Sequence, residues 1–97
     1  MADKSWYLYI ISCGDSSLYT GITLVVERRL QEHRTGRGSR YLRSRLPLKL
    51  VYQVETPGKS EALQLEYKVK QLTRAQKLGL ITAQPKLKKL YKIIEDD

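Results

Sequence analysis

The stretch from Trp6 to Thr23 reads WYLYIISCGDSSLYTGIT, and it predicts the fold more clearly than any other part of the chain. Its first six residues are aromatic or aliphatic, which favours a buried β-strand. Cys13 to Ser17 are typical turn residues, and Leu18 to Thr23 again favour a strand. We therefore expect an antiparallel hairpin, with Tyr9 and Ile11 on one face because side chains alternate along a strand.

The residues after this hairpin predict a helix that begins near Thr23 and ends near Gly36. We expect Thr23 to act as the N-cap, and Glu27 suits the positive end of the helix dipole. Gly36 permits the left-handed conformation that commonly ends a helix. The segment from Arg40 to Arg45 is expected to form one further helical turn, which Pro47 interrupts.

The second half of the chain predicts one strand and three helices. Apolar and polar residues alternate from Leu48 to Glu55, as in an amphipathic strand. Ser60 is expected to cap the next helix. Thr73 and Gln76 have the spacing of a capping box for a short helix that ends at Gly79. A last helix begins near Pro85, which is favoured in a first helical turn.

The predicted order is β-β-α-(α)-β-α-α-α, which contains no βαβ repeat. We therefore expect an α+β fold, with a small, three-stranded, mainly antiparallel sheet flanked by helices. A chain of 97 residues suffices for one domain. We expect a single domain over residues 1–97, with a core at about 6–73 and C-terminal helices at about 74–95.

The charge of the chain favours a polyanionic partner. The formal net charge is +8, and seven of the eight arginines lie between Arg28 and Arg45. Guanidinium groups pair well with phosphate, so nucleic acid is the expected ligand, although a solvated basic face is the simpler alternative. No apolar run is long enough for a membrane span. We expect no signal peptide, and the single Cys13 favours a reducing cytoplasm.

The chemistry available to the chain is limited. One histidine and one cysteine exclude a zinc site built from those residue types. The carboxylates do not cluster as a two-metal nuclease requires. Any catalysis must therefore use one or a few carboxylates together with tyrosine, arginine and histidine.

Arg29 and His33 are four residues apart, so both project from one face of the predicted helix. Taken singly, each has an ordinary interpretation, as a surface charge and as a helix-end residue near the negative dipole. Glu66 also has an ordinary interpretation, as the partner of Lys70 in an ion pair, because Lys70 follows it by one helical turn.

The order and spacing of these residues carry more information than any one of them. Tyr19 follows Tyr9 by ten positions, Arg29 follows Gly21 by eight, and Glu66 lies on a later helix. The ordered set, beginning with Tyr7-Leu8-Tyr9 and Tyr19-Thr20-Gly21, resembles the GIY-YIG nuclease family. In particular, the chain is similar to the small, stand-alone bacterial members of that family.

The resemblance implies a role for each matching residue. Tyr9 matches the tyrosine that serves as general base or positions the attacking water. Tyr19 matches a tyrosine that shapes the same pocket, and Gly21 matches the motif glycine. Whether His33, Arg29 or a metal-bound water lowers the pKa of Tyr9, or shares its proton, is left open by the sequence.

On the same basis, Arg29 matches the catalytic arginine, and His33 stands where members carry His or Tyr beside the nucleophile. Glu66 matches the carboxylate that holds one divalent metal ion, Mg²⁺ or Mn²⁺. Further nucleic-acid contacts are expected from basic side chains near this site, namely Arg28, Arg34, Arg37, Arg40, Arg43, Arg45 and Lys70.

Two functions follow from these expectations. The first is a metal-dependent DNA endonuclease, used in DNA repair or processing, with RNA as an open alternative substrate and a protein partner as one means of targeting. The second is a nucleic-acid-binding module with the same fold and little or no catalysis. Tyr7 stands in place of the first-motif glycine and Ile22 in place of a lysine found in repair members, and both differences motivate this second interpretation.

Overall fold

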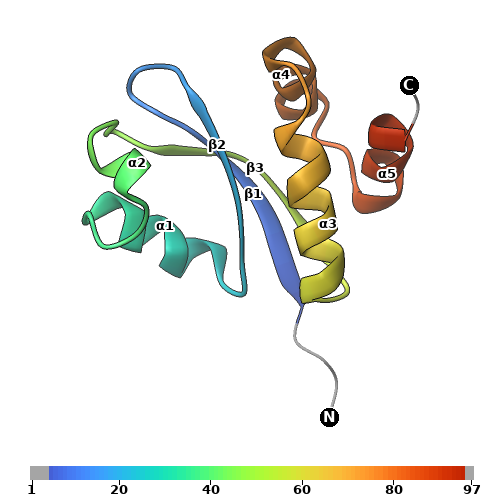
Figure 1. Ribbon diagram of the computed structural model, residues 1–97, viewed down its shortest axis with the longest axis horizontal. Coiled ribbons are helices and arrows are strands. Elements are labelled where there is room, and N and C mark those ends of the chain that lie inside the picture. The colour runs from blue at the N-terminus through green and yellow to red at the C-terminus, as the bar shows by residue number, and fades with distance from the viewer. Residues whose placement is uncertain (1–4, 96–97) are drawn as a thin grey trace.

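The computed structural model describes residues 5–95. Its centre is a three-stranded antiparallel sheet with the strand order β2-β1-β3 (Figure 1). Strand β1 spans Trp6–Ser12, β2 spans Leu18–Thr23 and β3 spans Lys49–Thr56. The predicted α+β fold and the predicted hairpin are therefore confirmed.

Helices cover both faces of this sheet, and their order along the chain is the predicted one. Helices α1 (Val26–Arg34) and α2 (Arg40–Arg43) follow β2. Helices α3 (Lys59–Lys70), α4 (Arg74–Ala83) and α5 (Leu87–Glu95) follow β3. Figure 1 shows the first pair on one side of the strands and the last three helices on the other.

Strand β1 separates two apolar cores, because its side chains alternate between the faces of the sheet. Leu8 and Ile10 are fully buried in the larger core, together with residues of α3, α4 and α5. Tyr9 and Ile11 point the other way, into a smaller core that includes Leu42 of α2. Tyr9 therefore lies on the face of the sheet that α1 and α2 cover.

Two of the predicted helix starts are wrong. Thr23 is still paired with Tyr7 in the sheet, and α1 begins after Val25. The Thr23 hydroxyl instead accepts a hydrogen bond from the backbone N–H of Val25, at 3.3 Å. Helix α3 begins at Lys59, with Gly58 as N-cap, so Ser60 already lies inside the helix.

The predicted end of α4 at Gly79 is also wrong, because the helix continues to Ala83. Continuation brings Leu80 into the larger core, where it is 2% exposed, and this burial outweighs the cost of a helical glycine. The helix ends at Gln84, which has a left-handed conformation with φ of 51°. The predicted capping box of Thr73 and Gln76 is present.

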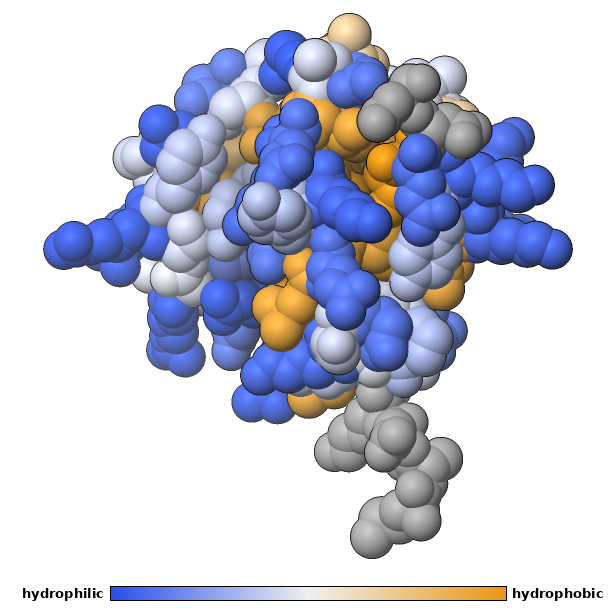
Figure 2. Space-filling view, turned by 45° about the vertical axis from the view of Figure 1, so that its right-hand side comes forward, coloured by the Kyte–Doolittle hydropathy of each residue, from blue (hydrophilic) through white to orange (hydrophobic). Residues whose placement is uncertain are grey.

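The surface agrees with the basic composition. Figure 2 shows hydrophilic residues over most of one face, with smaller apolar areas between them. Within residues 5–95, no helix combines the length and the apolar character that crossing a bilayer requires.

Candidate active site

Tyr9 lies directly opposite Gly21 in the β1–β2 ladder, and the two residues are in close contact. A Cβ atom at position 21 would lie 2.5 Å from the Tyr9 hydroxyl oxygen and 2.7 Å from Cζ. The ring of Tyr9 thus occupies the space that any side chain at position 21 would take. This packing is the physical reason for a glycine at the end of the Tyr19-Thr20-Gly21 motif.

A cluster of aromatic rings joins the hairpin to α1 and α2. The centroid of the Tyr19 ring lies 6.4 Å from that of Tyr9 and 5.6 Å from that of His33. On the other side, Tyr19 stacks with Tyr41 of α2 at 6.0 Å. Three elements that are separate in the sequence therefore meet around Tyr19.

The hydrogen bonds of His33 define its tautomer. Its Nδ1 atom accepts a hydrogen bond from the backbone N–H of Ser39, at 3.1 Å. Its Nε2 atom lies 3.0 Å from the Tyr9 hydroxyl. Because a backbone N–H can only donate, Nδ1 must be unprotonated, and a neutral imidazole then carries its proton on Nε2. His33 therefore donates to Tyr9 and cannot accept the proton of Tyr9.

The segment after α1 holds His33 in this orientation. A Cβ atom at Gly38 would collide with Nδ1 of His33, so only glycine lets the backbone pass this close. Gly36 has φ of 80°, which allows the chain to turn back toward the helix. Sequence reasoning used Gly36 only as the end of the helix and missed the support that Gly38 and Ser39 provide. The closely spaced glycines were the available signal.

Electrostatic effects on Tyr9 and His33 follow from burial and from nearby charges. Burial raises the pKa of Tyr9 to about 12, with Tyr19 and Glu66 adding to the rise and the guanidinium of Arg29 opposing it. Burial and the positive charge of Arg29 lower the pKa of His33. A neutral His33 agrees with the tautomer that its hydrogen bonds require.

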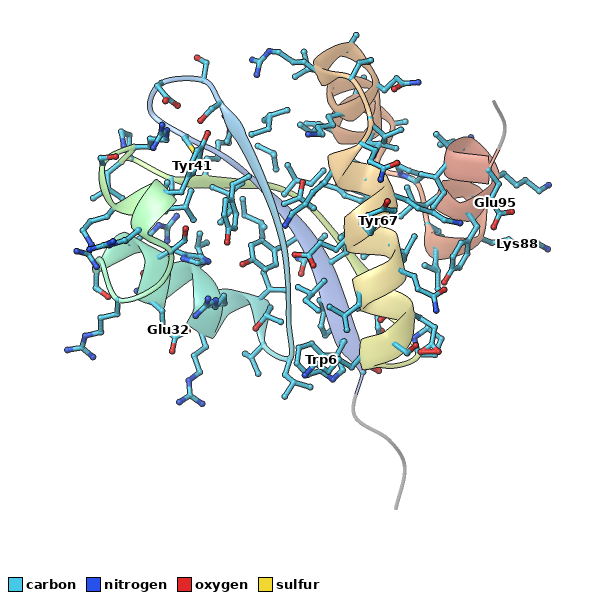
Figure 3. The ribbon with its side chains drawn as sticks, viewed as in Figure 1. Trp6, Glu32, Tyr41, Tyr67, Lys88 and Glu95 are labelled. Atoms are coloured by element: carbon cyan, nitrogen blue, oxygen red, sulfur yellow. The ribbon has the colours of Figure 1, made fainter. Side chains whose placement is uncertain are left out.

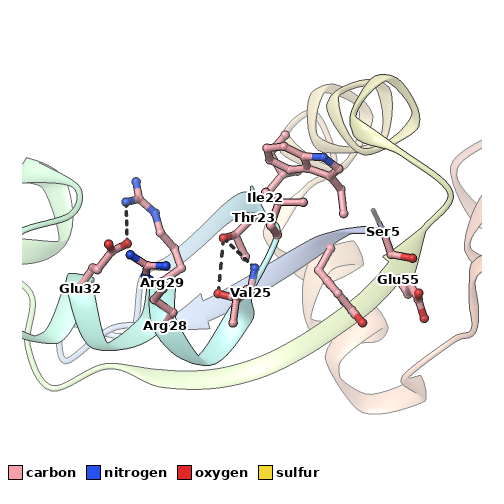
Figure 4. Close-up of a pocket in the computed structure, with 11 residues that line it drawn as sticks. Ser5, Ile22, Thr23, Val25, Arg28, Arg29, Glu32 and Glu55 are labelled. Atoms are coloured by element: carbon pink, nitrogen blue, oxygen red, sulfur yellow. Dashed lines mark hydrogen bonds and ion pairs between the residues drawn. The ribbon is translucent and has the colours of Figure 1, made fainter. Parts of the chain in front are cut away.

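Arg29 lies between Tyr9 and a surface cavity that has a volume of about 800 Å³. Its Nη1 atom pairs with Oε1 of Glu32 at 3.2 Å, and its side chain is 38% exposed. Figure 4 shows Arg28, Arg29 and Glu32 at one side of this cavity and Glu55 at the other. A phosphate approaching from this side can reach the guanidinium.

Glu66 approaches the site from α3. Figure 3 shows Tyr67 on this helix and Tyr41 on α2, on opposite sides of β2. The Glu66 side chain is 21% exposed and pairs with Nζ of Lys70 at 3.3 Å, as helical spacing allows. Its charge contributes to the raised pKa of Tyr9, so the carboxylate lies within electrostatic range of that hydroxyl.

Glu66 is the only expected metal ligand in this group. Residues 5–95 contain no group of three or more His, Cys, Asp or Glu side chains that could hold a metal ion. One partly exposed carboxylate fits Mg²⁺, which commonly keeps several waters and takes its other ligands from substrate phosphates.

The structure brings the sequence-predicted catalytic residues together from four elements. Tyr9 and Tyr19 come from the hairpin, Arg29 and His33 from α1, and Glu66 from α3. The alternation of β1 and β2 places both tyrosines on the face that α1 covers, where Arg29 and His33 lie. Glu66 comes from α3, on the other side of the strands (Figure 1), and lies within electrostatic range of Tyr9.

The arginines that were expected to bind phosphate fall into two groups. Arg34 donates to the carbonyl oxygen of Leu48 at 3.2 Å. Arg45 pairs with Asp15 at 3.0 Å and lies over the ring of Tyr41, with Cζ 3.7 Å from the centroid. These two have structural partners. The others are exposed on or near α1 and α2, namely Arg28, Arg37, Arg40 and Arg43.

Comparison with known proteins identifies the class that this fold and site define. The family model described as the GIY-YIG catalytic domain matches residues 5–79. The chain belongs to the GIY-YIG family, whose domain is a nuclease fold.

Among curated relatives, a UPF0213 protein of Oceanobacillus iheyensis is 50% identical over 82 residues, covering 84% of this chain and 95% of the relative. A UPF0213 protein of Cupriavidus pinatubonensis is 47% identical over 77 residues, covering 79% and 86%. These relatives are small members of the family, and their names specify no activity.

A solved structure, the UPF0213 protein of Bacillus halodurans determined by solution NMR, has a TM-score of 0.54 and 43% identity. The match covers 81% of this chain and 84% of that chain. A protein of E. faecalis, also solved by NMR, has a TM-score of 0.58 and 37% identity, covering 86% and 90%.

Proposed function

We propose that this protein is a divalent-metal-dependent endonuclease that hydrolyses phosphodiester bonds of DNA in repair or processing. The observation that carries the proposal is the environment of Tyr9. Its hydroxyl receives a hydrogen bond from His33 at 3.0 Å, lies within range of Arg29 and is approached by Glu66 from α3. Hydrolysis needs a positioned water, neutralisation of phosphoryl charge and help for the leaving oxygen.

In this proposal Tyr9 is the general base. Because His33 donates to the Tyr9 oxygen, the hydroxyl proton must point away from His33. The phenolate form would be stabilised by the hydrogen bond from Nε2–H of His33 and by the charge of Arg29. The charge of Arg29 opposes the effect of burial on the pKa of Tyr9. Tyr9 first loses its hydroxyl proton to solvent, and the phenolate then takes a proton from the attacking water. The water oxygen bonds to phosphorus, the bond from phosphorus to the leaving oxygen breaks, and the leaving oxygen takes a proton from solvent.

Arg29 would bind the phosphate that is attacked. Its guanidinium is shared with Glu32, so a phosphate must compete with that carboxylate or approach the remaining N–H groups. Two parallel N–H donors match two phosphoryl oxygens and would neutralise charge that develops during attack.

Glu66 would hold the metal ion, at the side of the site opposite Arg29. When bound there, Mg²⁺ would supply Lewis-acid stabilisation of the phosphate and of the leaving oxygen. To bind a cation, Glu66 must give up its contact with Lys70.

The test is incubation of purified protein with single-stranded, nicked, flapped and branched DNA, and with matching RNA, in Mg²⁺ or Mn²⁺. We expect cleavage of at least one substrate, and a fall of about 10²-fold or more in rate for Glu66→Gln and for Tyr9→Phe. Absence of cleavage with every substrate, or a rate unchanged by Glu66→Gln, would contradict the proposal. Salt-sensitive binding without cleavage would instead support the nucleic-acid-binding module.

A further inference from the structure

A second, smaller cavity lies at the other end of β2 and shares one side chain with the group of catalytic residues described above. Its volume is about 320 Å³. The residues that line it come from β2, α2, α3 and α4, and they are Leu18, Tyr19, Thr20, Tyr41, Lys70 and Lys77. Sequence reasoning did not identify Lys77 as a site residue.

This cavity adjoins the site through a shared side chain. Tyr19 lines the cavity, and its ring centroid lies 6.4 Å from that of Tyr9. The larger cavity beside Arg29 is lined by Ile22 and Thr23, so the two cavities lie at opposite ends of β2, with Gly21 between them. A nucleic-acid strand that follows β2 would pass both.

The lining chemistry suits an anion. Lys70 and Lys77 line this one small space from two consecutive helices and carry the two positive charges beside it. The ring of Tyr41 lines the cavity, stacks with Tyr19 at 6.0 Å between centroids, and has Cζ of Arg45 3.7 Å from its own centroid. Two lysines and no carboxylate are among the six lining residues, so a phosphate is the group that the cavity fits best.

Lys70 has a second partner, the carboxylate of Glu66 at 3.3 Å. The ammonium group neutralises this carboxylate where the proposed function places a metal ion. Lys70 is 55% exposed, so the pair is weak and the side chain can turn away. A cation on Glu66 would repel Lys70 and leave it free to contact an anion.

We propose that Lys70 and Lys77 bind the phosphate next to the scissile one along the strand, and that Lys70 exchanges Glu66 for this phosphate. The inference rests on the proposed function, because the position of the scissile phosphate is set by Tyr9 and Arg29.

The first test measures binding of a short labelled oligonucleotide at several salt concentrations, without metal and without cleavage. We expect Lys77→Gln to reduce the slope of log K against log salt by about 0.7 for single-stranded DNA, which corresponds to one phosphate fewer in contact with the protein. Lys70→Gln should reduce the slope as well, by a smaller amount, because without metal the phosphate must compete with Glu66 for Lys70. Lys68→Gln is the matched control, because Lys68 carries the same charge on α3 but does not line the cavity. Slopes equal to wild type for both variants would overturn the subsite.

The second test measures Mn²⁺ binding in the absence of DNA, from the broadening of NMR signals around Glu66. We expect Lys70→Gln to bind Mn²⁺ about twofold more tightly, because a competing cation has been removed. Lys77→Gln should bind it as wild type does. Equal affinity in all three proteins would overturn the exchange at Glu66.

These outcomes are distinct from those of the cleavage assay. If the wild type cuts no DNA but both lysine variants show a reduced salt slope, the phosphate subsite is supported and the nuclease proposal is contradicted. If the wild type cuts DNA but both lysine variants show the wild-type salt slope, the nuclease proposal is supported and the phosphate subsite is contradicted.

Discussion

At the scale of single residues, contacts with only a few atoms position Tyr9, the proposed general base. Tyr9 is 2% exposed, and its ring has room only because Gly21 has no side chain. Its hydroxyl accepts a hydrogen bond from Nε2–H of His33, and the backbone N–H of Ser39 selects this tautomer by donating to Nδ1. Two backbone features, neither of them chemically reactive, therefore position the proposed base.

We predict that Gly21→Ala displaces the Tyr9 ring, because the new Cβ would lie 2.5 Å from its hydroxyl oxygen. The expected cost is about 1–3 kcal/mol in the free energy of unfolding, as for overpacked cores, measured by urea denaturation. In a Tyr9→Ala background the same change should cost much less, because the ring is absent. Equal costs in the two backgrounds would show that the contact with Tyr9 is not the cause.

His33 predicts a pH dependence of stability. Its pKa is lowered in the folded protein, so the unfolded chain, with a pKa of about 6.5, takes up a proton at higher pH. Stability is therefore full above about pH 6.5 and falls as the pH decreases below that value. The slope from this group is at most about 1.4 kcal/mol per pH unit.

The measurement is urea unfolding at pH 7.5 and at pH 5.5, for wild type and for His33→Gln. Glutamine does not titrate, so the variant should lose less stability than wild type between these two conditions. A drop of the same size in both proteins would assign the effect to other groups.

At the scale of single elements, α4 combines a strong start with a weak interior. Its first turn has a complete capping box, with the Thr73 hydroxyl accepting from Gln76 N–H at 3.1 Å. Its interior contains Gly79, where an added Cβ would meet nothing within 4 Å. The helix continues through this glycine because Leu80 is buried against the sheet.

Two substitutions in α4 should therefore change stability in opposite directions. Thr73→Ala removes the cap and should lower the free energy of unfolding by about 1 kcal/mol. Gly79→Ala should raise it by about 0.5–1 kcal/mol, because alanine loses less backbone entropy and has room for its methyl group. Thermal and urea unfolding report both. A destabilising Gly79→Ala would mean that this glycine has another packing role.

At the scale of the whole molecule, the positive charge is present on both sides of the sheet. Arg40 and Arg43 lie on α2, beside the tyrosine cluster, whereas Lys88 and Lys92 lie on α5. Figure 3 shows Lys88 at the edge of the molecule opposite Tyr41. If nucleic acid binds along β2, only the first pair is close to it.

We therefore predict that the double variant Arg40→Gln/Arg43→Gln weakens DNA binding and lowers its salt dependence, by about 0.7–0.9 in slope for each phosphate that the protein no longer neutralises. Lys88→Gln/Lys92→Gln is the matched control with the same change in net charge, and it should bind almost as wild type does. Fluorescence anisotropy at increasing salt measures both. Equally weakened binding in the two variants would indicate binding through net charge alone.

Much of the fold could be predicted from local patterns. The hairpin, the order of the elements and the capping box of α4 depend on neighbouring residues, and the structure confirms them. The predicted helix starts at Thr23 and Ser60 and the end at Gly79 were wrong. At Thr23 pairing in the sheet outweighed the local preference, and at Gly79 burial of Leu80 did so. At Ser60 the helix has already begun, because the Gly58 carbonyl accepts a hydrogen bond from the N–H of Ala62.

By itself, the sequence determined which residues could take part in chemistry, because their types, order and spacing are local and countable. Only the tertiary structure decided how they meet. The tautomer of His33, the packing of Tyr9 on Gly21 and the position of Lys77 beside Lys70 all join elements far apart in the chain. Such contacts depend on how the sheet alternates and how helices pack on both its faces, which no single segment specifies.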